Sequence, residues 1–230
     1  MSAVRYPVVE LRQYTLRPGQ RDVLIDLFDR EFVESQEAEG MAIVGQFRDL
    51  DDPDRFVWIR GFGSMPSRAR ALAAFYGGPA WKAHSAEANA TMIDSDNVLL
   101  LRPVSGRSGF PAPPAARPPV GAAPAGPSRI LVTLYYRDQP FDQAFADFYD
   151  RRARPALIEA GALPLACLQT VYAENTFPAL PVRTGENVFA CLARFPSDVH
   201  LDGYLRQDRR LITGAAQQLR LAPTARSLLR

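Results

Sequence analysis

Cysteine is scarce in this sequence, with only Cys167 and Cys191 among 230 residues. Two thiols cannot build the disulfide framework of a small secreted domain, so we expect both to be reduced and buried. Long apolar runs are also missing. Stretches such as Val98–Leu101 fall far short of the roughly 20 apolar residues that a membrane-spanning helix needs. Since no apolar leader follows Met1, the sequence predicts a cytoplasmic protein that does not enter a membrane.

Histidine and net charge are in short supply as well. His84 and His200 are the only histidines, and no Cys-x-x-Cys or His-x-x-x-His spacing offers a metal site. The formal net charge of +2 is too small for a nucleic-acid surface. A phosphate-binding loop, a dinucleotide-binding glycine motif and a Gly-x-Ser-x-Gly elbow are all absent. We therefore expect no metal, no cofactor and no nucleic-acid partner.

The chain does contain enough hydrophobic residues, 47%, to bury a core. Residues 104–127 interrupt it with seven prolines, four glycines and no acidic residue. Such a segment forms neither a helix nor a central strand, which predicts an extended linker. Its Pro111–Pro114 run also loosely resembles a ligand for aromatic grooves. The sequence thus predicts two domains, residues 1–103 and 128–230.

Hydrophobic periodicity indicates the elements of the first domain. Alternation predicts strands, helical spacing predicts helices, and turn residues separate them. The predicted strands are Val8–Leu16, Ala42–Asp49, Arg55–Phe62 and Asn97–Pro103; the predicted helices run from Leu24 to Gly40 and from Ser67 to Met92, the second broken at Gly77–Pro79. This β-α-β-β-α-β order is typical of the ferredoxin-like fold, an antiparallel sheet with helices on one face.

The second domain repeats the pattern. Leu27–Arg30 can be laid over Phe148–Arg151, and Phe56–Phe62 over Phe189–Phe195. We infer tandem ferredoxin-like repeats in an α+β fold. Each sheet has one bare apolar face, so we expect the two sheets to pack face to face as a pseudo-dimer of the α/β-barrel type. The linker is long enough for packing within one chain or exchange between two chains, and we expect a homo-oligomer.

Four strings carry a family resemblance: Glu10–Tyr14, Phe56–Phe62, Phe75–Asn89 and Ser95–Pro103. Through them the first domain resembles the NIPSNAP family of the dimeric α/β-barrel superfamily. The resemblance implies the barrel architecture. It leaves the reaction open, because superfamily relatives include cofactor-free monooxygenases, cyclases, haem-degrading enzymes and aldoxime dehydratases. The second domain lacks the Trp-x-x-His string, which favours a site in the first.

One candidate group lies in the second helical stretch. Trp81 and His84 are three residues apart and so share a helix face, with Asn89 on an adjacent stripe. An imidazole in a pocket can move a proton near neutral pH. The alternative is a histidine that only fixes the helix against its neighbours. Haem ligation by His84 stays open because superfamily relatives use a helix histidine.

A second group lies on the strands. Glu10, Arg12 and Tyr14 share one face of the first strand, and Arg60 lies within an otherwise apolar strand. Buried polar groups need partners. They therefore predict either a structural ion-pair network or a site where Arg60 and Tyr14 hold an anionic or carbonyl-bearing molecule while Glu10 orients the arginine.

Together these residues predict a small-molecule site. We expect a mostly apolar pocket lined by Tyr14, Arg60, Tyr76, Trp81 and His84, with Glu10, Arg12 and Asn89 contributing to it. If the protein is an enzyme, we expect a cofactor-independent monooxygenase, cyclase or lyase in which His84 moves a proton and Arg60 stabilises an enolate or carboxylate. The alternative function is a non-enzymatic scaffold or interaction module.

Overall fold

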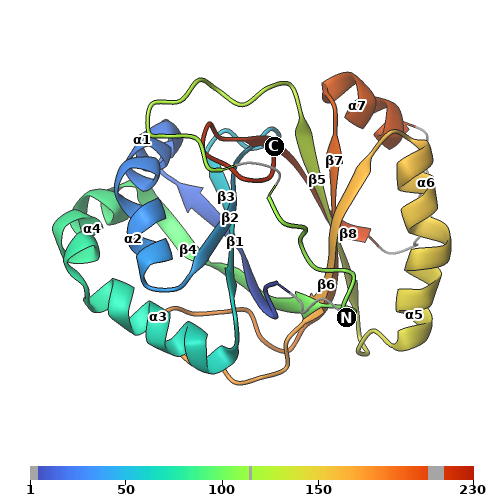
Figure 1. Ribbon diagram of the computed structural model, residues 1–230, viewed down its shortest axis with the longest axis horizontal. Helices are drawn as coiled ribbons and strands as arrows, with labels where there is room; N and C mark the ends of the chain where they lie inside the picture. The colour runs from blue at the N-terminus through green and yellow to red at the C-terminus, as the bar shows by residue number, and fades with distance from the viewer. Residues whose placement is uncertain (1–4, 114–115, 207–214) are drawn as a thin grey trace.

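The computed structural model describes residues 5–113, 116–206 and 215–230 (Figure 1). The first half contains β1 (Val8–Leu16), α1 (Arg21–Leu27), the π-helical turn η1 (Phe28–Phe32), α2 (Val33–Ala38), β2 (Ala42–Asp49), β3 (Arg55–Phe62), α3 (Met65–Gly77), α4 (Pro79–Thr91) and β4 (Met92–Pro103). The second half contains β5 (Arg129–Arg137), α5 (Gln143–Phe148), η2 (Tyr149–Ala153), α6 (Arg154–Glu159), β6 (Leu163–Thr170), β7 (Asn187–Phe195), α7 (Asp198–Arg206) and β8 (Ala215–Pro223).

The strands form a closed antiparallel barrel in the order β1-β3-β2-β8-β5-β7-β6-β4. Helices α1–α4 cover its outside on one flank and α5–α7 cover the opposite flank, as Figure 1 shows. Two short seams join the halves. At one, Phe47–Asp49 pair with Leu221–Pro223, and at the other Leu101–Pro103 pair with Leu168–Thr170. The two sheets expected to stack face to face are therefore joined at their edges, which gives every edge strand a hydrogen-bonding neighbour.

Alternation along β1 explains how the barrel is filled. Val9 and Leu11 point inward, whereas Val8 and Tyr14 point outward to the helices. The interior cluster also takes buried side chains from the second half, for example Val132. Because opposite walls of the barrel supply this one core, neither half could bury its inner face alone.

The break between α3 and α4 falls where the sequence predicts it. Ser64 accepts a hydrogen bond from the Ser67 backbone N–H and caps the start of α3. At Gly78 the backbone is extended, with φ −83° and ψ 171°, and α4 begins with Pro79. A Cβ at Gly78 would lie 2.8 Å from the carbonyl oxygen of Ala74, so a larger residue would strain this corner.

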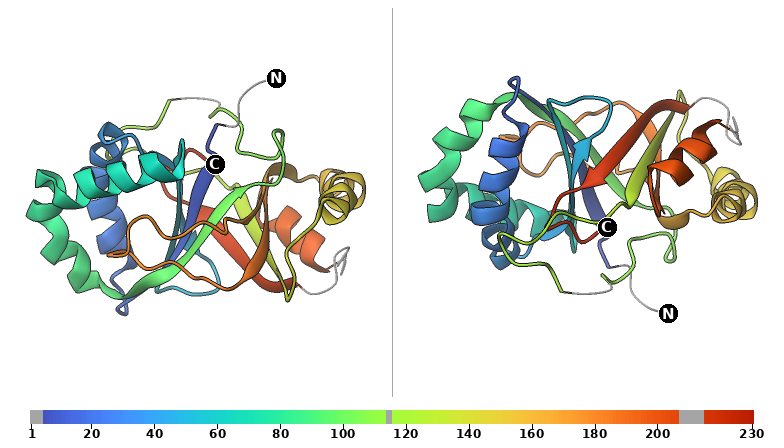
Figure 2. Two further views of the ribbon diagram at one scale, coloured as in Figure 1. Left: turned by 90° about the horizontal axis from the view of Figure 1, so that it is seen from below. Right: turned by 90° about the horizontal axis from the view of Figure 1, so that it is seen from above.

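Two features lie outside the predicted pattern. Strand β4 begins at Met92 rather than Asn97, with bulged pairing to β1 at Thr15 and Leu16. Its first residues are mostly exposed and polar, so hydrophobic alternation gave no signal there. The loop of residues 171–186 between β6 and β7 leaves the second half and runs beside the helices of the first, as the orange segment of Figures 1 and 2 shows.

That loop is fastened to the first half at its two ends. The Val171 N–H donates to the Leu100 carbonyl at 2.9 Å, and the Arg183 N–H donates to the Val98 carbonyl at the same distance. The loop therefore follows the outer part of β4.

Within the described ranges, no helix combines the length and apolar character that crossing a bilayer requires.

Candidate functional site

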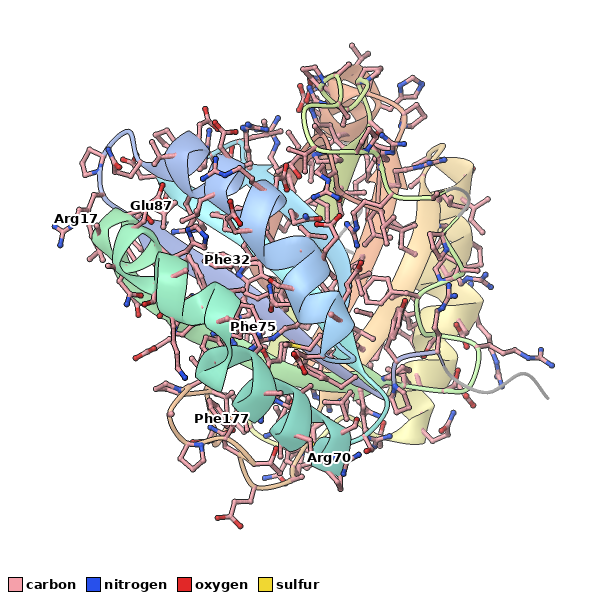
Figure 3. The ribbon with its side chains drawn as sticks, turned by 60° about the vertical axis from the view of Figure 1, so that its left-hand side comes forward. Arg17, Phe32, Arg70, Phe75, Glu87 and Phe177 are labelled. Atoms are coloured by element: carbon pink, nitrogen blue, oxygen red, sulfur yellow. The ribbon has the colours of Figure 1, made fainter. Side chains whose placement is uncertain are left out.

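A small cavity of about 30 Å³ lies between strands β1 and β3 and the helices of the first half. Its walls are mainly aromatic: Tyr14, Phe28, Phe32, Trp58, Phe75, Tyr76 and Trp81. Figure 3 shows Phe32 and Phe75 in the furrow between the α1–η1–α2 helix and the α3–α4 pair. The cavity therefore lies where two helical segments meet over the sheet.

Trp81 closes this cavity from α4. Its ring centroid lies 4.8 Å from that of Tyr76 and 5.6 Å from that of Phe32. On the outer side, Phe177 of the 171–186 loop stacks on Tyr76 at 5.9 Å and 24°. The second half of the chain thus packs a ring against a residue of the cavity wall in the first half.

A buried cluster of charges lies on the same face of the sheet. The Glu10 carboxylate accepts hydrogen bonds from Arg12 Nη1 at 2.7 Å, from Arg60 Nε at 2.7 Å and from Arg68 Nε at 2.6 Å. All four side chains are at most 1% exposed. Three guanidinium groups therefore share one carboxylate, which leaves two formal positive charges buried without an acidic partner among these four residues.

This arrangement fixes the ionisation of Glu10. Burial by itself raises the pKa of a carboxyl group, but the guanidinium groups of Arg60, Arg12 and Arg68 outweigh it and hold the pKa of Glu10 well below its usual range. The Trp58 ring lies 5.0 Å from the Arg60 guanidinium and 5.4 Å from that of Arg12. These cation–π contacts offset part of the cost of the excess positive charge.

Two hydrogen-bond donors of the cavity wall lack acceptors among the described residues. The indole N–H of Trp58 is buried and has no partner in that part of the chain. The Tyr14 hydroxyl accepts a hydrogen bond from Arg12 Nε at 3.1 Å, which leaves its own proton free to be donated. Burial raises the pKa of Tyr14, with the charge of Arg12 acting against it, so the hydroxyl stays protonated at neutral pH. Both residues line the same, mainly apolar cavity.

The structure brings most of the predicted site residues together in two layers. Tyr14, Tyr76 and Trp81 line the cavity, whereas Glu10, Arg12 and Arg60 form the charged cluster beside it. Arg60 is thus placed in the cluster and not in the cavity wall where the sequence analysis expected it. Its Nη1 donates to Gln36 Oε1, 3.0 Å away, and Gln36 does line the cavity.

His84 and Asn89 lie outside the cavity wall. His84 is 30% exposed, and its Nε2 is 3.4 Å from Glu31 Oε2. Its ring centroid lies 6.3 Å from that of Phe32, so Trp81 and His84 both contact the Phe32 ring from α4. Asn89 is exposed to solvent. Because His84 does not line the cavity, ligation of haem by His84 stays a hypothesis from the sequence.

Sequence analysis missed Arg68 and its partners. Arg68 Nη1 donates to Asn175 Oδ1 at 3.0 Å and to Thr176 Oγ1 at 3.1 Å, both in the 171–186 loop. A signal for Arg68 was present, because it precedes the buried Leu72 and Phe75 of α3 at helical spacing and so faces the sheet. No local pattern indicates the contacts of Arg68 with the loop, because Arg68 and Asn175 are 107 residues apart in the chain.

The second half has an uncharged counterpart. On β5, Leu131 and Thr133 stand at the positions that Glu10 and Arg12 take on β1 when the halves are aligned, and they line a cavity of about 20 Å³.

Throughout the described ranges, no three side chains of histidine, cysteine, aspartate or glutamate gather in a way that could hold a metal ion. The absence of a metal remains a prediction.

Comparison with known proteins bears on the fold and the family. Residues 9–106 match the NIPSNAP family model. A NIPSNAP family protein of Agrobacterium tumefaciens is 21% identical, covering 43% of this chain and 93% of that one, with a TM-score of 0.40. No curated protein matches the sequence.

Two solved structures match nearly the whole chain. They are candidate monooxygenases of Lactobacillus acidophilus and Fusobacterium nucleatum, each 11% identical with a TM-score of 0.55. The two matches cover 95% and 97% of this chain and 94% of each of the other two chains. At this identity the likeness shows a shared fold and not a shared reaction. The match to the family model spans the cavity and all four residues of the charged cluster: residues 9–106 belong to the NIPSNAP family.

Proposed function

We propose that the first half binds a small organic molecule through a carbonyl or carboxylate oxygen, and that the aromatic cavity is the inner end of its binding site. The observation that carries this proposal is the pair of donors, Trp58 N–H and Tyr14 O–H, that line one apolar space without acceptors among the described residues. A buried donor without a partner costs free energy, and a ligand oxygen would remove that cost.

The site must open to admit such a ligand, since pockets for organic molecules have volumes of roughly 300 Å³ or more and this cavity has about 30 Å³. Helix α4 is the element best suited to move. Its buried residues are only Ala88 and Thr91, and Gly78 separates it from α3. Elements with few buried contacts open at low cost in free energy. Movement of α4 would carry Trp81 out of the cavity.

The chemistry that fits these donors is stabilisation of an oxyanion. The Arg12 guanidinium polarises the Tyr14 hydroxyl, and Tyr14 and Trp58 donate to an oxygen on which negative charge develops. Arg60 acts through Glu10 and Gln36 and keeps this face positive. Such a site suits cofactor-independent enolate chemistry, as in a monooxygenase, cyclase or lyase. His84 stays the candidate for the proton-transfer step that its residue type predicts.

We further propose that the two halves are diverged copies of one ferredoxin-like unit. Strand order supports this, because β4-β1-β3-β2 in the first half corresponds to β8-β5-β7-β6 in the second. A π-helical turn interrupts the first helix of each half, η1 at Phe28–Phe32 and η2 at Tyr149–Ala153. Assembly into a homo-oligomer and a cytoplasmic location remain predictions from the sequence.

A second candidate function is a scaffold or interaction module without a ligand. The closed cavity favours it, as does the position of His84 outside the cavity wall. On this view the charged cluster only fastens the sheet to α3 and to the 171–186 loop.

Native mass spectrometry of the protein purified from its own host separates the two functions. We expect a retained molecule with a carbonyl or acidic group, lost in Trp58→Phe and Tyr14→Phe, which keep an aromatic ring at each position and remove the donor. Tyr172→Phe removes an exposed hydroxyl of the second half and serves as the matched control. A wild-type protein that carries no ligand, or variants that retain it, would support the scaffold. His84→Gln then tests the proton role, since it should keep the ligand and lose turnover.

A further inference from the structure

Cys167 of β6 and Cys191 of β7 face each other directly across the antiparallel ladder. Both thiols are free and buried. They lie in the second half, on the face of the sheet covered by η2 and α6, and the site proposed above uses neither. Two nucleophilic side chains are thus placed side by side in a part of the molecule without an assigned role.

The hydrogen bonds of Cys167 define the type of this pair. Its backbone N–H donates to the Ser108 carbonyl at 2.8 Å, and its carbonyl accepts from the Val104 N–H at 3.1 Å. Both groups therefore point away from β7, which makes Cys167–Cys191 a non-hydrogen-bonded pair. In such pairs the Cα atoms are about 4.5 Å apart and the side chains are at their closest. Disulfides form at Cα separations of about 4.4 to 6.8 Å.

The two thiols differ in access. Cys167 lines a polar cavity of about 460 Å³ together with Arg107, Arg154 and Asp150. Cys191 instead lines the separate cavity of about 20 Å³ beneath Tyr149. Burial raises the pKa of the Cys191 thiol, which disfavours its reactive thiolate form. A small reagent can therefore approach Cys167 first.

We propose that Cys167 and Cys191 form a redox-active dithiol that reduces hydroperoxides. The Cys167 sulfur attacks the terminal peroxide oxygen, the O–O bond breaks, and Cys167 becomes a sulfenic acid while an alcohol or water leaves. The Cys191 sulfur then attacks the sulfenic sulfur, forming the disulfide and releasing water. The two thiols give up two electrons and two protons, and the peroxide accepts them.

Tyr149 is placed to assist this step. Its hydroxyl is buried beside the thiols of Cys167 and Cys191. Burial, together with the neighbouring thiols of Cys191 and Cys167, raises the pKa of Tyr149, so the hydroxyl remains a donor at neutral pH. It can donate to the sulfenate oxygen as the second sulfur attacks.

The test treats the fully reduced, folded protein with hydrogen peroxide and follows its intact mass. We expect loss of two hydrogen atoms, a Cys167–Cys191 peptide in a non-reducing digest, and reversal by dithiothreitol. In Cys191→Ala, dimedone should trap a sulfenic acid at Cys167. In Cys167→Ala, dimedone labelling of Cys191 should be at least about tenfold slower than that of Cys167 in Cys191→Ala, because Cys191 lines the small cavity beneath Tyr149 and not the polar one.

A matched pair of arginine variants checks the role of the polar cavity. Arg154→Ala removes a lining residue, and we expect oxidation to slow by about threefold or more. Arg151→Ala removes an exposed arginine of the same helical segment, outside the cavity lining, and should leave the rate unchanged. The proposal fails if both thiols stay free in the folded protein under peroxide that oxidises them in urea. It also fails if Cys191 reacts as fast alone as Cys167 does.

Discussion

Glu10 is the single residue on which the charged cluster depends. It is the shared acceptor for Arg12, Arg60 and Arg68, and water does not reach any of the four side chains. Loss of one arginine would lower the excess positive charge. Loss of the carboxylate would leave three like charges together in a medium of low polarity, where their repulsion is weakly screened.

We therefore expect Glu10→Gln to lower the free energy of unfolding by about 3 to 5 kcal/mol, the usual cost of breaking a buried ion pair from one side. Urea denaturation followed by circular dichroism measures it. The matched control is Asp22→Asn, which removes the carboxylate of the exposed pair with Arg48 and should cost about 0.5 kcal/mol or less. Equal losses for the two variants would contradict a special role for Glu10.

The same carboxylate gives a pH dependence of known sign. The folded-state pKa of Glu10 lies below its unfolded value of 4.5, so its contribution to stability is complete above that pH. It is lost as the pH falls below 4.5. The stability of wild type relative to Glu10→Gln should therefore decrease on acidification.

Asp29 gives a dependence of the opposite sign. Burial raises its pKa to about 6, although Arg226 and Arg117 act against this. Between pH 4 and 6 the folded state holds a proton that the unfolded state has lost, so stability falls as the pH rises. Asp29→Asn should remove this slope and stabilise the protein at pH 7 by about 1 kcal/mol, a value reduced for solvent screening. Thermal unfolding across this range tests it, with the exposed Asp138→Asn of the second half as control.

At the scale of elements, α3 and α4 differ in how firmly they are held. The buried residues of α3 include Arg68, Leu72 and Phe75, whereas those of α4 are Ala88 and Thr91. We expect the amides of α4 to exchange with deuterium faster than those of α3, because local opening of α4 breaks fewer buried contacts. Hydrogen-exchange mass spectrometry measures both helices in one experiment. Equal protection would argue against α4 as the moving part of the site.

Elements with strong periodicity were predictable from the sequence. The ends of β1, β2 and β3 agree with the alternation of their residues, and the Gly77–Pro79 break separates α3 from α4. The early start of β4 was not predictable, since exposed strand residues carry no hydrophobic signal. The π-helical turns were missed for a similar reason, because one extra residue in a helical turn leaves the apolar pattern nearly unchanged.

At the scale of the whole molecule, the shared interior core predicts cooperative unfolding. Both tryptophans, Trp58 and Trp81, lie in the first half, and both cysteines lie in the second. Tryptophan fluorescence and thiol reactivity therefore report the halves separately. We expect their urea transitions to coincide, because each half needs the other to cover its inner face. Thiol exposure at lower urea than the fluorescence change would show that the second half unfolds independently.

The candidate site was only partly predictable at this scale. Residues on β1 and β3 share a face by strand geometry, so Glu10, Tyr14 and Arg60 could be grouped from the sequence. The contacts from Asn175 and Phe177 could not be, because the barrel closure that brings the loop to α3 depends on pairing between distant strands. Local patterns do not encode that closure.

The 171–186 loop has a consequence for stoichiometry. In a barrel made from two identical chains, every loop would occur twice. Any residue that a loop adds to one site would then also be present in the symmetry-related site. In this chain the loop contacts α3 of the first half through Asn175 and Phe177, while the corresponding connection of the first half, residues 50–54, is a short turn. The two flanks of the barrel are thus free to specialise, and a ligand of the first half should bind at one molecule per chain instead of two.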